Sequence, residues 1–502
     1  MKKSFLNFEI NDSKYQYLLS QQVDKRFNRH LSIGTNLVLN YTDNTEVLHQ
    51  HIDDTMVVVV GLCVDAYKKL ERAQIPNYIL SLIDSNDKSS ISILAANTSR
   101  FAGKYIILLK NKTGLFMIGD ATSSLPIYYS DVENSVYASS SEHLLATHIG
   151  FSKSTSSTKI QSLAAANMPL PYNLSHYENL LFLLPNHLVN ITTKEVMRYS
   201  TKVSIPEYKN EVEVLERTKL LINNITEEYA KYYKLVCPLT AGTDSRVVLS
   251  FLHNVNKQTE CYTLKFDNTS DTSDELVVPK KICKALGINH STIEVLESSK
   301  SNIDSAYSII GRNNITEQRL NLSLTLREKF DQDNAIIYGD IIDQIGKSGT
   351  FGDTPNIFAT NSYLNTKTHS FSKRNFEVTK TYINKLKKEV NYSSVYDYFA
   401  LEIRCGRWAS QNSEVNNSLG VNMLNIFNNT EVIMLWMTLN RTNRKNLVVH
   451  KYFLKNQLPT LDAYPFNPDS KVKKIKNNKY LYALASYIKF YYQKNKIRKN
   501  SF

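Results

Sequence analysis

Strand and helix patterns alternate along residues 234–295, and this alternation constrains the fold more than any other feature of the sequence. Apolar runs typical of buried strands end at Leu239, Phe266 and Val295, and the first two are followed by segments with helical spacing of apolar residues. Strands that alternate with helices form parallel sheets, because each helix returns the chain to the starting edge of the sheet. The sequence therefore predicts an α/β domain here.

The pattern differs on either side of this segment. From Phe5 to about Ile205, short β-type runs are separated by turn residues, which is typical of packed antiparallel sheets. After a later strand at Ala335–Asp340, residues 382–502 show helical patterns throughout. A chain of 502 residues exceeds what one core usually supports. We expect an N-terminal sandwich over 1–205, an α/β domain with a helical C-terminal part over 206–470, and a tail over 471–502.

Several classes of protein are disfavoured by composition. The apolar runs are far shorter than the roughly 20 residues that cross a bilayer, and the N-terminus lacks the apolar core of a secretory signal. The five cysteines are scattered without a C-x-x-C pair, which argues against a disulfide framework and a zinc site. We therefore expect a cytoplasmic protein without a transmembrane segment.

The net charge of +13 is concentrated at the end of the chain. Residues 471–502 hold nine Lys and one Arg and no acidic residue, which leaves +3 for the rest. Apolar residues from Leu481 to Tyr491 follow helical spacing between these cations, as in a helix that binds an anionic surface. A solvated basic helix that packs its aromatic stripe on its own domain fits equally well.

The turn at residues 240–245 carries the candidate chemistry. In an open parallel sheet, ligands collect at the carboxyl ends of strands, where the next helix directs its N–H groups. Gly242 and three hydroxyl side chains suit phosphate oxygens, whereas Asp244 would repel them unless a divalent cation lay between. The turn predicts a phosphate site with Mg²⁺. An ordinary turn with a helix-capping Asp or Ser is the alternative.

The segment "LTAGTDSR" resembles the S-G-G-x-D-S pyrophosphate loop of the N-type ATP pyrophosphatases (PP-loop superfamily), and its surroundings are similar to class B asparagine synthetases and their β-lactam synthetase relatives. Thr240 stands for the family's serine and Ala241 for its first glycine, which is harmless only at negative φ. The resemblance implies a set of nucleotide-binding residues: Leu239, Thr240, Ala241, Gly242, Thr243, Asp244, Ser245, Leu264 and Gly339.

A second segment, "IIYGDIIDQIG", is similar to the family's G-[DE]-G-x-D-E turn. The resemblance implies a proton-handling role for Asp340, and makes Asp343 a metal ligand together with Asp244. Ile341 replaces a glycine and Gln344 a glutamate. The family also supplies a late lysine that is not found at the expected place. Two cations could substitute for it in catalysis, namely Arg246 and Lys347.

The N-terminal part resembles the glutaminase domain of the same family, which has an Ntn-hydrolase fold, over residues 100–150 and again over 180–199. The family nucleophile is a cysteine directly after the initiator methionine, and Lys2 occupies that position. Residues 60–62 read Val-Gly-Leu where the family holds glutamine with Asn-Gly-Glu. We expect a degenerate glutaminase-like domain without glutaminase activity.

The resemblance implies an asparagine synthetase-like, ATP-dependent carbon–nitrogen ligase that uses ATP and Mg²⁺. It would adenylate a small-molecule or peptide carboxylate with loss of pyrophosphate, and an amine or ammonia would then displace AMP. A catalytically inactive binding or scaffold protein with the same fold is the alternative. A PP-loop enzyme that modifies RNA is less favoured, because the chain has no cysteine pair for sulfur transfer.

Overall fold

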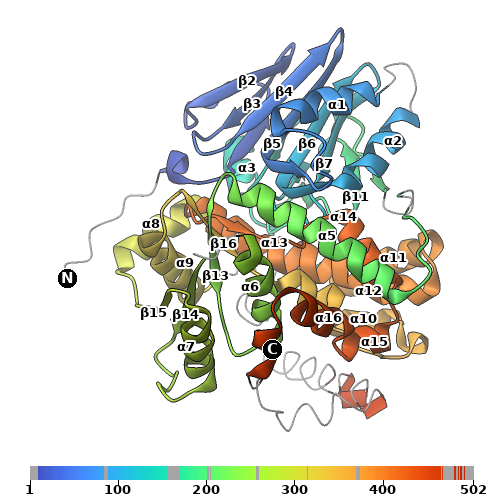
Figure 1. The fold of residues 1–502 in the computed structure, drawn as a ribbon. Helices are drawn as coiled ribbons and strands as arrows, with labels where there is room; N and C mark the ends of the chain where they lie inside the picture. Colours follow the sequence, from blue (N-terminus) through green and yellow to red (C-terminus); the bar gives the residue numbers. More distant parts are fainter. Residues whose placement is uncertain are drawn as a thin grey trace.

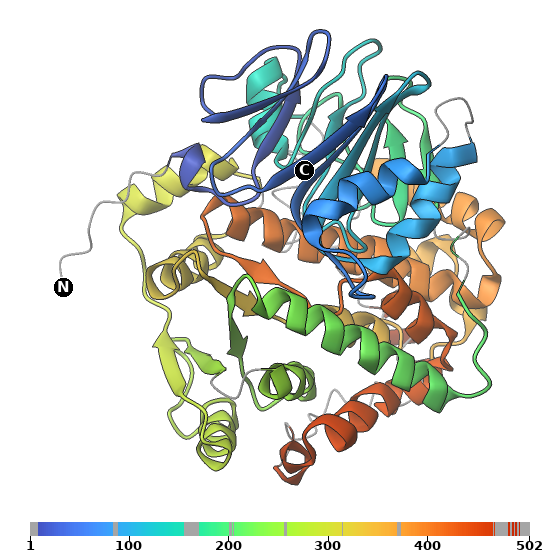
Figure 2. The same ribbon diagram turned by 45° about the horizontal axis from the view of Figure 1, so that its top comes forward.

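The computed structural model describes residues 9–83, 89–154, 170–199, 203, 205–255, 259–313, 315–368, 373–464, 466, 480–481, 484–485, 487–488 and 491. The N-terminal sheets lie on one side of the molecule, and the parallel sheet and most helices lie on the other (Figure 1). The long helix α5 (Glu211–Ala230) runs along the junction between them, as a second view also shows (Figure 2).

Two six-stranded antiparallel sheets form the N-terminal part, as the sequence predicts. The first has the order β10-β8-β9-β1-β3-β2, and the second has the order β12-β11-β7-β6-β5-β4. The strands are β1 (Tyr17–Ser20), β2 (Arg29–Gly34), β3 (Leu37–Tyr41), β4 (Val47–Ile52), β5 (Thr55–Asp65), β6 (Phe101–Asn111), β7 (Gly114–Gly119), β8 (Tyr128–Ser130), β9 (Ala138–Ser139), β10 (Leu180–Phe182), β11 (His187–Asn190) and β12 (Val196–Arg198). Among the described residues, the helices α1 (Ile75–Ser81), α2 (Ser89–Asn97) and α3 (Glu142–Ile149) accompany them.

A five-stranded parallel sheet forms the centre of the second part, which confirms the predicted α/β arrangement. Its order is β15-β14-β13-β16-β17, and all its pairs are parallel. The strands are β13 (Lys234–Pro238), β14 (Glu260–Lys265), β15 (His290–Glu294), β16 (Asn334–Ile337) and β17 (Met423–Leu424). The helices between them are α6 (Thr243–Val255), α7 (Asp274–Leu286), α8 (Lys300–Ile310) and α9 (Glu317–Lys329).

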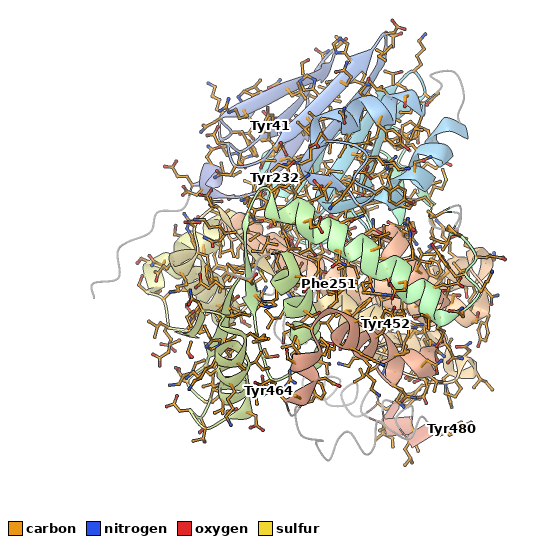
Figure 3. The ribbon with its side chains drawn as sticks, in the orientation of Figure 1. Tyr41, Tyr232, Phe251, Tyr452, Tyr464 and Tyr480 are labelled. Carbon is orange, nitrogen blue, oxygen red and sulfur yellow. The ribbon has the colours of Figure 1, made fainter. Side chains whose placement is uncertain are left out.

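Helices dominate the C-terminal region, but the prediction that it is wholly helical is wrong, because β17 pairs with β16 through Met423 and Leu424. Two residues are too few to show a strand period in the sequence. The helices are α10 (Asn361–Thr366), α11 (Lys373–Glu389), α12 (Val395–Phe399), the π-helical η8 (Ala400–Ala409), α13 (Ser410–Ser418), α14 (Thr430–Thr438), α15 (Arg441–Lys445) and α16 (Val448–Gln457). Phe251 of α6, labelled in Figure 3, packs edge-on against Phe453 of α16 with 5.2 Å between ring centroids.

Side chains just after β17 join the two parts of the molecule. The Asn428 side-chain amide donates to the Gly103 carbonyl at 2.6 Å and to Asp120 Oδ1 at 2.9 Å. The next amide, that of Asn429, donates to the carbonyls of Ser99 and Phe101, each at 2.9 Å. A core cluster also contains residues of both parts. The antiparallel sheets therefore contact the α/β part through hydrogen bonds and a shared hydrophobic core.

Most of the basic tail lies outside the described residues, and so does Lys2. In the tail, Tyr487 packs on Tyr363 and shares a hydrogen bond with Thr360, whereas Leu484 and Ile488 are more than half exposed. All five cysteines are free and buried. No helix in the described ranges is both long and apolar enough to cross a membrane.

Candidate active site

The two predicted turns meet at the point where the strand order of the parallel sheet reverses. β13 lies between β14 and β16, so the chain leaves β13 to one side and returns on the other. Such a reversal opens a crevice at the carboxyl ends of the two strands, where ligands bind in open α/β sheets. Gly339 follows β16, and a Cβ there would lie 3.0 Å from Val248 Cγ2 and 3.4 Å from the Asp244 carbonyl oxygen. This close approach brings the second turn against the start of α6.

The first turn is held by its own side chains. The Thr240 amide donates to Ser245 Oγ and the Gly242 amide donates to Thr240 Oγ1, each at 3.1 Å. Leu239 is buried, and its amide donates to the Tyr262 carbonyl of β14. Ala241 does not adopt a positive φ, so the replacement of a glycine there causes no backbone strain.

A carboxylate already accepts a hydrogen bond from one of the backbone amides that would bind a phosphate. The Ala241 amide donates to Glu275 Oε2 at 3.1 Å, and Glu275 lies in the first turn of α7. A negative charge at this amide opposes a phosphate that approaches the same group. We expect Glu275→Gln, which keeps an acceptor and removes the charge, to bind ATP about tenfold more tightly in calorimetric titrations. Glu294→Gln, at an exposed carboxylate on β15, serves as the control and should leave the affinity unchanged; equal affinities for all three proteins would contradict the expectation.

The two predicted metal ligands converge on one ammonium group. Lys347 Nζ lies 2.9 Å from Asp343 Oδ1 and 3.5 Å from Asp244 Oδ2. The second oxygen of each carboxylate is also bonded: His450 Nε2 lies 2.7 Å from Asp244 Oδ1, and the Gln344 amide donates to Asp343 Oδ2 at 2.5 Å. Asp244, Asp343 and Lys347 thus lie together at the carboxyl ends of two neighbouring strands.

These contacts shift the pKa values of Asp244 and Lys347. Burial alone would raise the pKa of Asp244, but the hydrogen bond from His450 and the charge of Lys347 lower it overall. Burial would lower the pKa of Lys347, but Asp343 and Asp244 raise it. Both groups are therefore charged near neutral pH, and they form a compact ionic cluster.

Asp340 has a different environment from these two carboxylates. It is half-buried, and the Asn425 side-chain amide donates to its Oδ1 at 2.7 Å. Burial raises the pKa of Asp340 to about 7, against the lowering effect of Asn425 and with a further increase from Asp343. A carboxyl group with a pKa near neutrality can both accept and release a proton at physiological pH.

The raised pKa of Asp340 predicts a pH dependence of stability. Between its ordinary pKa of 3.8 and its folded value of about 7, the folded state holds a proton that the unfolded state has released. The free energy of unfolding should therefore fall as the pH rises through this window. Urea unfolding of the wild type and of Asp340→Asn from about pH 4 to about pH 8 should show the wild type losing stability relative to the variant. Parallel curves would contradict this assignment.

Arg246 is not placed as its predicted catalytic role requires. Its guanidinium is fully buried and donates to the carbonyls of Ala241 at 2.9 Å and Tyr464 at 2.9 Å. Tyr464, labelled in Figure 3, follows the 3₁₀ turn Pro459–Ala463. Since these donors are directed at backbone carbonyls, Arg246 holds the turn in place rather than facing a phosphate. Leu264, predicted to contact adenine, lies partly buried at the end of β14.

The donor set at this site suits a hard cation that is shared with phosphates. The described part of the chain holds no group of three or more His, Cys, Asp or Glu side chains placed to bind a metal. Mg²⁺ commonly takes only one or two protein carboxylates and completes its coordination with water and substrate phosphates. Asp244 and Asp343 fit that requirement.

Sequence reasoning missed two residues of the site. His450 comes from α16, about 200 residues after the turn that it supports, and a lone histidine in a helical pattern gives no signal of its partner. Glu275 lies in the first turn of α7, and nothing in its local sequence indicates that its carboxylate reaches the Ala241 amide.

Comparisons with known proteins add little to this geometry. No family model matches the chain, and no curated protein matches it. Among solved structures, the chain is similar to a glutamine-dependent NAD+ synthetase from Acinetobacter baumannii in complex with adenosine diphosphate, at 15% identity and a TM-score of 0.20. The match covers 33% of this chain and 32% of that one. A likeness of this degree supports no conclusion about the chain.

Proposed function

We propose that the chain is an ATP-dependent carbon–nitrogen ligase that activates a carboxylate by adenylation and passes it to an amine. The observation that carries this proposal is the convergence of Asp244 and Asp343, from two neighbouring strand ends, on one cation position. The resemblance of both turns to the PP-loop synthetases gives the reaction class. Asparagine synthetase-like chemistry is the form that we favour.

The proposed reaction gives a function to the 240–245 turn and to three carboxylates of the site. Amides of the 240–245 turn and the N-terminus of α6 would bind phosphate oxygens. Asp244 and Asp343 would hold Mg²⁺, which neutralises charge on the departing pyrophosphate. A substrate carboxylate oxygen attacks the α-phosphorus, and the bond to the β-phosphate breaks. The amine then attacks the acyl carbon and AMP leaves, while Asp340 accepts the proton that the amine loses.

The N-terminal part would serve this reaction without hydrolysing glutamine. We propose a degenerate Ntn domain over 1–205, a synthetase domain over 206–470 and a separate tail over 471–502. Cys63 is buried in β5, and burial raises the pKa of its thiol well above the usual range, so it is no substitute nucleophile. The amine should therefore come from free ammonia or from an amino group on a second substrate.

The test is ATP–pyrophosphate exchange with a panel of carboxylic acids, followed by detection of AMP when an amine is added. Exchange that depends on one acid would support the proposal. Binding of ATP without exchange for any acid would favour the second candidate, a binding protein of the same fold. One observation favours that candidate: Ala241, Asp244 and Asp343 are already satisfied by side chains of the chain itself.

A further inference from the structure

The Asp244–Asp343 pair already holds a cation supplied by its own chain. The Lys347 ammonium lies within ion-pair distance of one oxygen from each carboxylate, at 3.5 Å and 2.9 Å. A divalent ion held by the same two oxygens would have to lie between the two carboxylates, where the ammonium already lies. Two cations held between the same two carboxylates would repel each other strongly. The ammonium and the metal therefore exclude each other.

The other oxygen of each carboxylate has a hydrogen-bond partner that is harder to displace. Asp244 Oδ1 is bonded to His450, whose side chain is 1% exposed, and Asp343 Oδ2 is bonded to the amide of its neighbour Gln344. The Lys347 side chain, in contrast, is 33% exposed. Among the described contacts of the pair, the one with Lys347 is therefore the easiest for an incoming ion to displace.

The Lys347 side chain can also move away from the two carboxylates. Its ammonium is carried on a flexible four-carbon side chain, directly after the π-helical segment η5 (Ile342–Gly346). A triphosphate on the neighbouring 240–245 turn would bring several negative oxygens near it. Those oxygens compensate the charge of the ammonium and also supply ligands to a metal, so they favour exchange of one cation for the other.

We propose that Lys347 is a built-in counter-ion that excludes divalent cations from the Asp244–Asp343 pair until a triphosphate draws its ammonium away. The metal then enters with the nucleotide rather than before it. This inference rests on the proposed function only for the identity of the triphosphate, since the exclusion itself follows from the three side chains.

The experiment measures Mn²⁺ binding by calorimetry in the absence of nucleotide, with the wild type, Lys347→Met and Lys347→Gln. Both variants should bind Mn²⁺ about tenfold or more tightly than the wild type, because the competing charge is gone. Lys445→Met is the matched control: Lys445 forms a partly buried pair with Asp353 at 2.8 Å, and its loss should leave Mn²⁺ binding unchanged. The double variant Lys347→Met/Asp343→Asn should not show this increase in Mn²⁺ affinity.

A second arm adds a non-hydrolysable ATP analogue. Mn²⁺ affinity should then rise more in the wild type than in Lys347→Met, because only the wild type must first release a lysine. Equal Mn²⁺ affinities for the wild type and both Lys347 variants, with or without the analogue, would overturn the inference, as would tight metal binding by the wild type alone. If the wild type binds no analogue, the proposed function fails instead, and the nucleotide-free comparison still decides whether Lys347 excludes the metal.

Discussion

Asp343→Asn should lower the rate of ATP–pyrophosphate exchange by about 100-fold to 1,000-fold. The substitution keeps the shape of the side chain but removes one of the two negative charges that would hold Mg²⁺ against the phosphates. It also leaves Lys347 with Asp244 as its remaining carboxylate partner among the described ion pairs. Because pyrophosphate gains charge as it leaves, a weakly held metal affects the rate more than it affects the binding of ATP.

Asp353→Asn is the matched control for this variant. Asp353 also pairs with a lysine, Lys445, and the two side chains are similarly exposed. We expect the rate of ATP–pyrophosphate exchange in this control to be within about twofold of the wild-type rate, because a partly exposed ion pair contributes little to stability. Thermal unfolding should show that both variants fold. Full exchange activity in Asp343→Asn would remove Asp343 from the site and with it the proposed metal position.

Glu402→Gln should lower the free energy of unfolding by about 3–5 kcal/mol. Glu402 is fully buried in η8 and accepts two hydrogen bonds from Arg198 of β12, at 2.7 and 2.9 Å. The same carboxylate also accepts from Tyr382 and Asn186. The substitution leaves the buried guanidinium without its full counter-charge, and that penalty is larger than the loss of an ordinary hydrogen bond.

Urea unfolding measures this effect, with Asp43→Asn as the control. Asp43 forms an exposed pair with Arg29 at 2.8 Å, and its loss should leave the free energy of unfolding nearly unchanged. Arg198 and Glu402 come from the two parts of the molecule, so a single cooperative transition in both variants is also expected. A loss below about 1 kcal/mol in Glu402→Gln would show that the network contributes little to stability.

The sequence predicts most of the fold because its local patterns agree with the tertiary arrangement. The spacing of apolar residues after the strand that ends at Phe266 predicts a helix, and α7 (Asp274–Leu286) forms there. Its Ser273 cap accepts a hydrogen bond from the Glu275 amide, and Gly287 at its C-terminus adopts a positive φ, so both ends are encoded locally. β17, in contrast, is a two-residue strand whose pairing is decided by β16, about 90 residues earlier in the chain.

The candidate site is predictable only in part, for a related reason. Asp244 and Asp343 follow strands that the sequence reveals, so their meeting can be inferred from topology. Whether a basic side chain faces the site or is buried beneath it depends on tertiary packing, which local sequence patterns do not indicate. Arg246 and Lys347 are therefore equivalent candidates in the sequence, although one is fully buried and the other is 33% exposed.

The segment that follows β17 has a consequence for how this molecule can change over time. Asn425 holds Asp340, and three residues later Asn428 is anchored to Gly103 and Asp120. The antiparallel sheets would thus remain under selection whatever else they do, because they support the segment that orients the Asp340 carboxyl group. Drift in the β6 region should therefore impair the neighbouring crevice before it unfolds the sheets themselves.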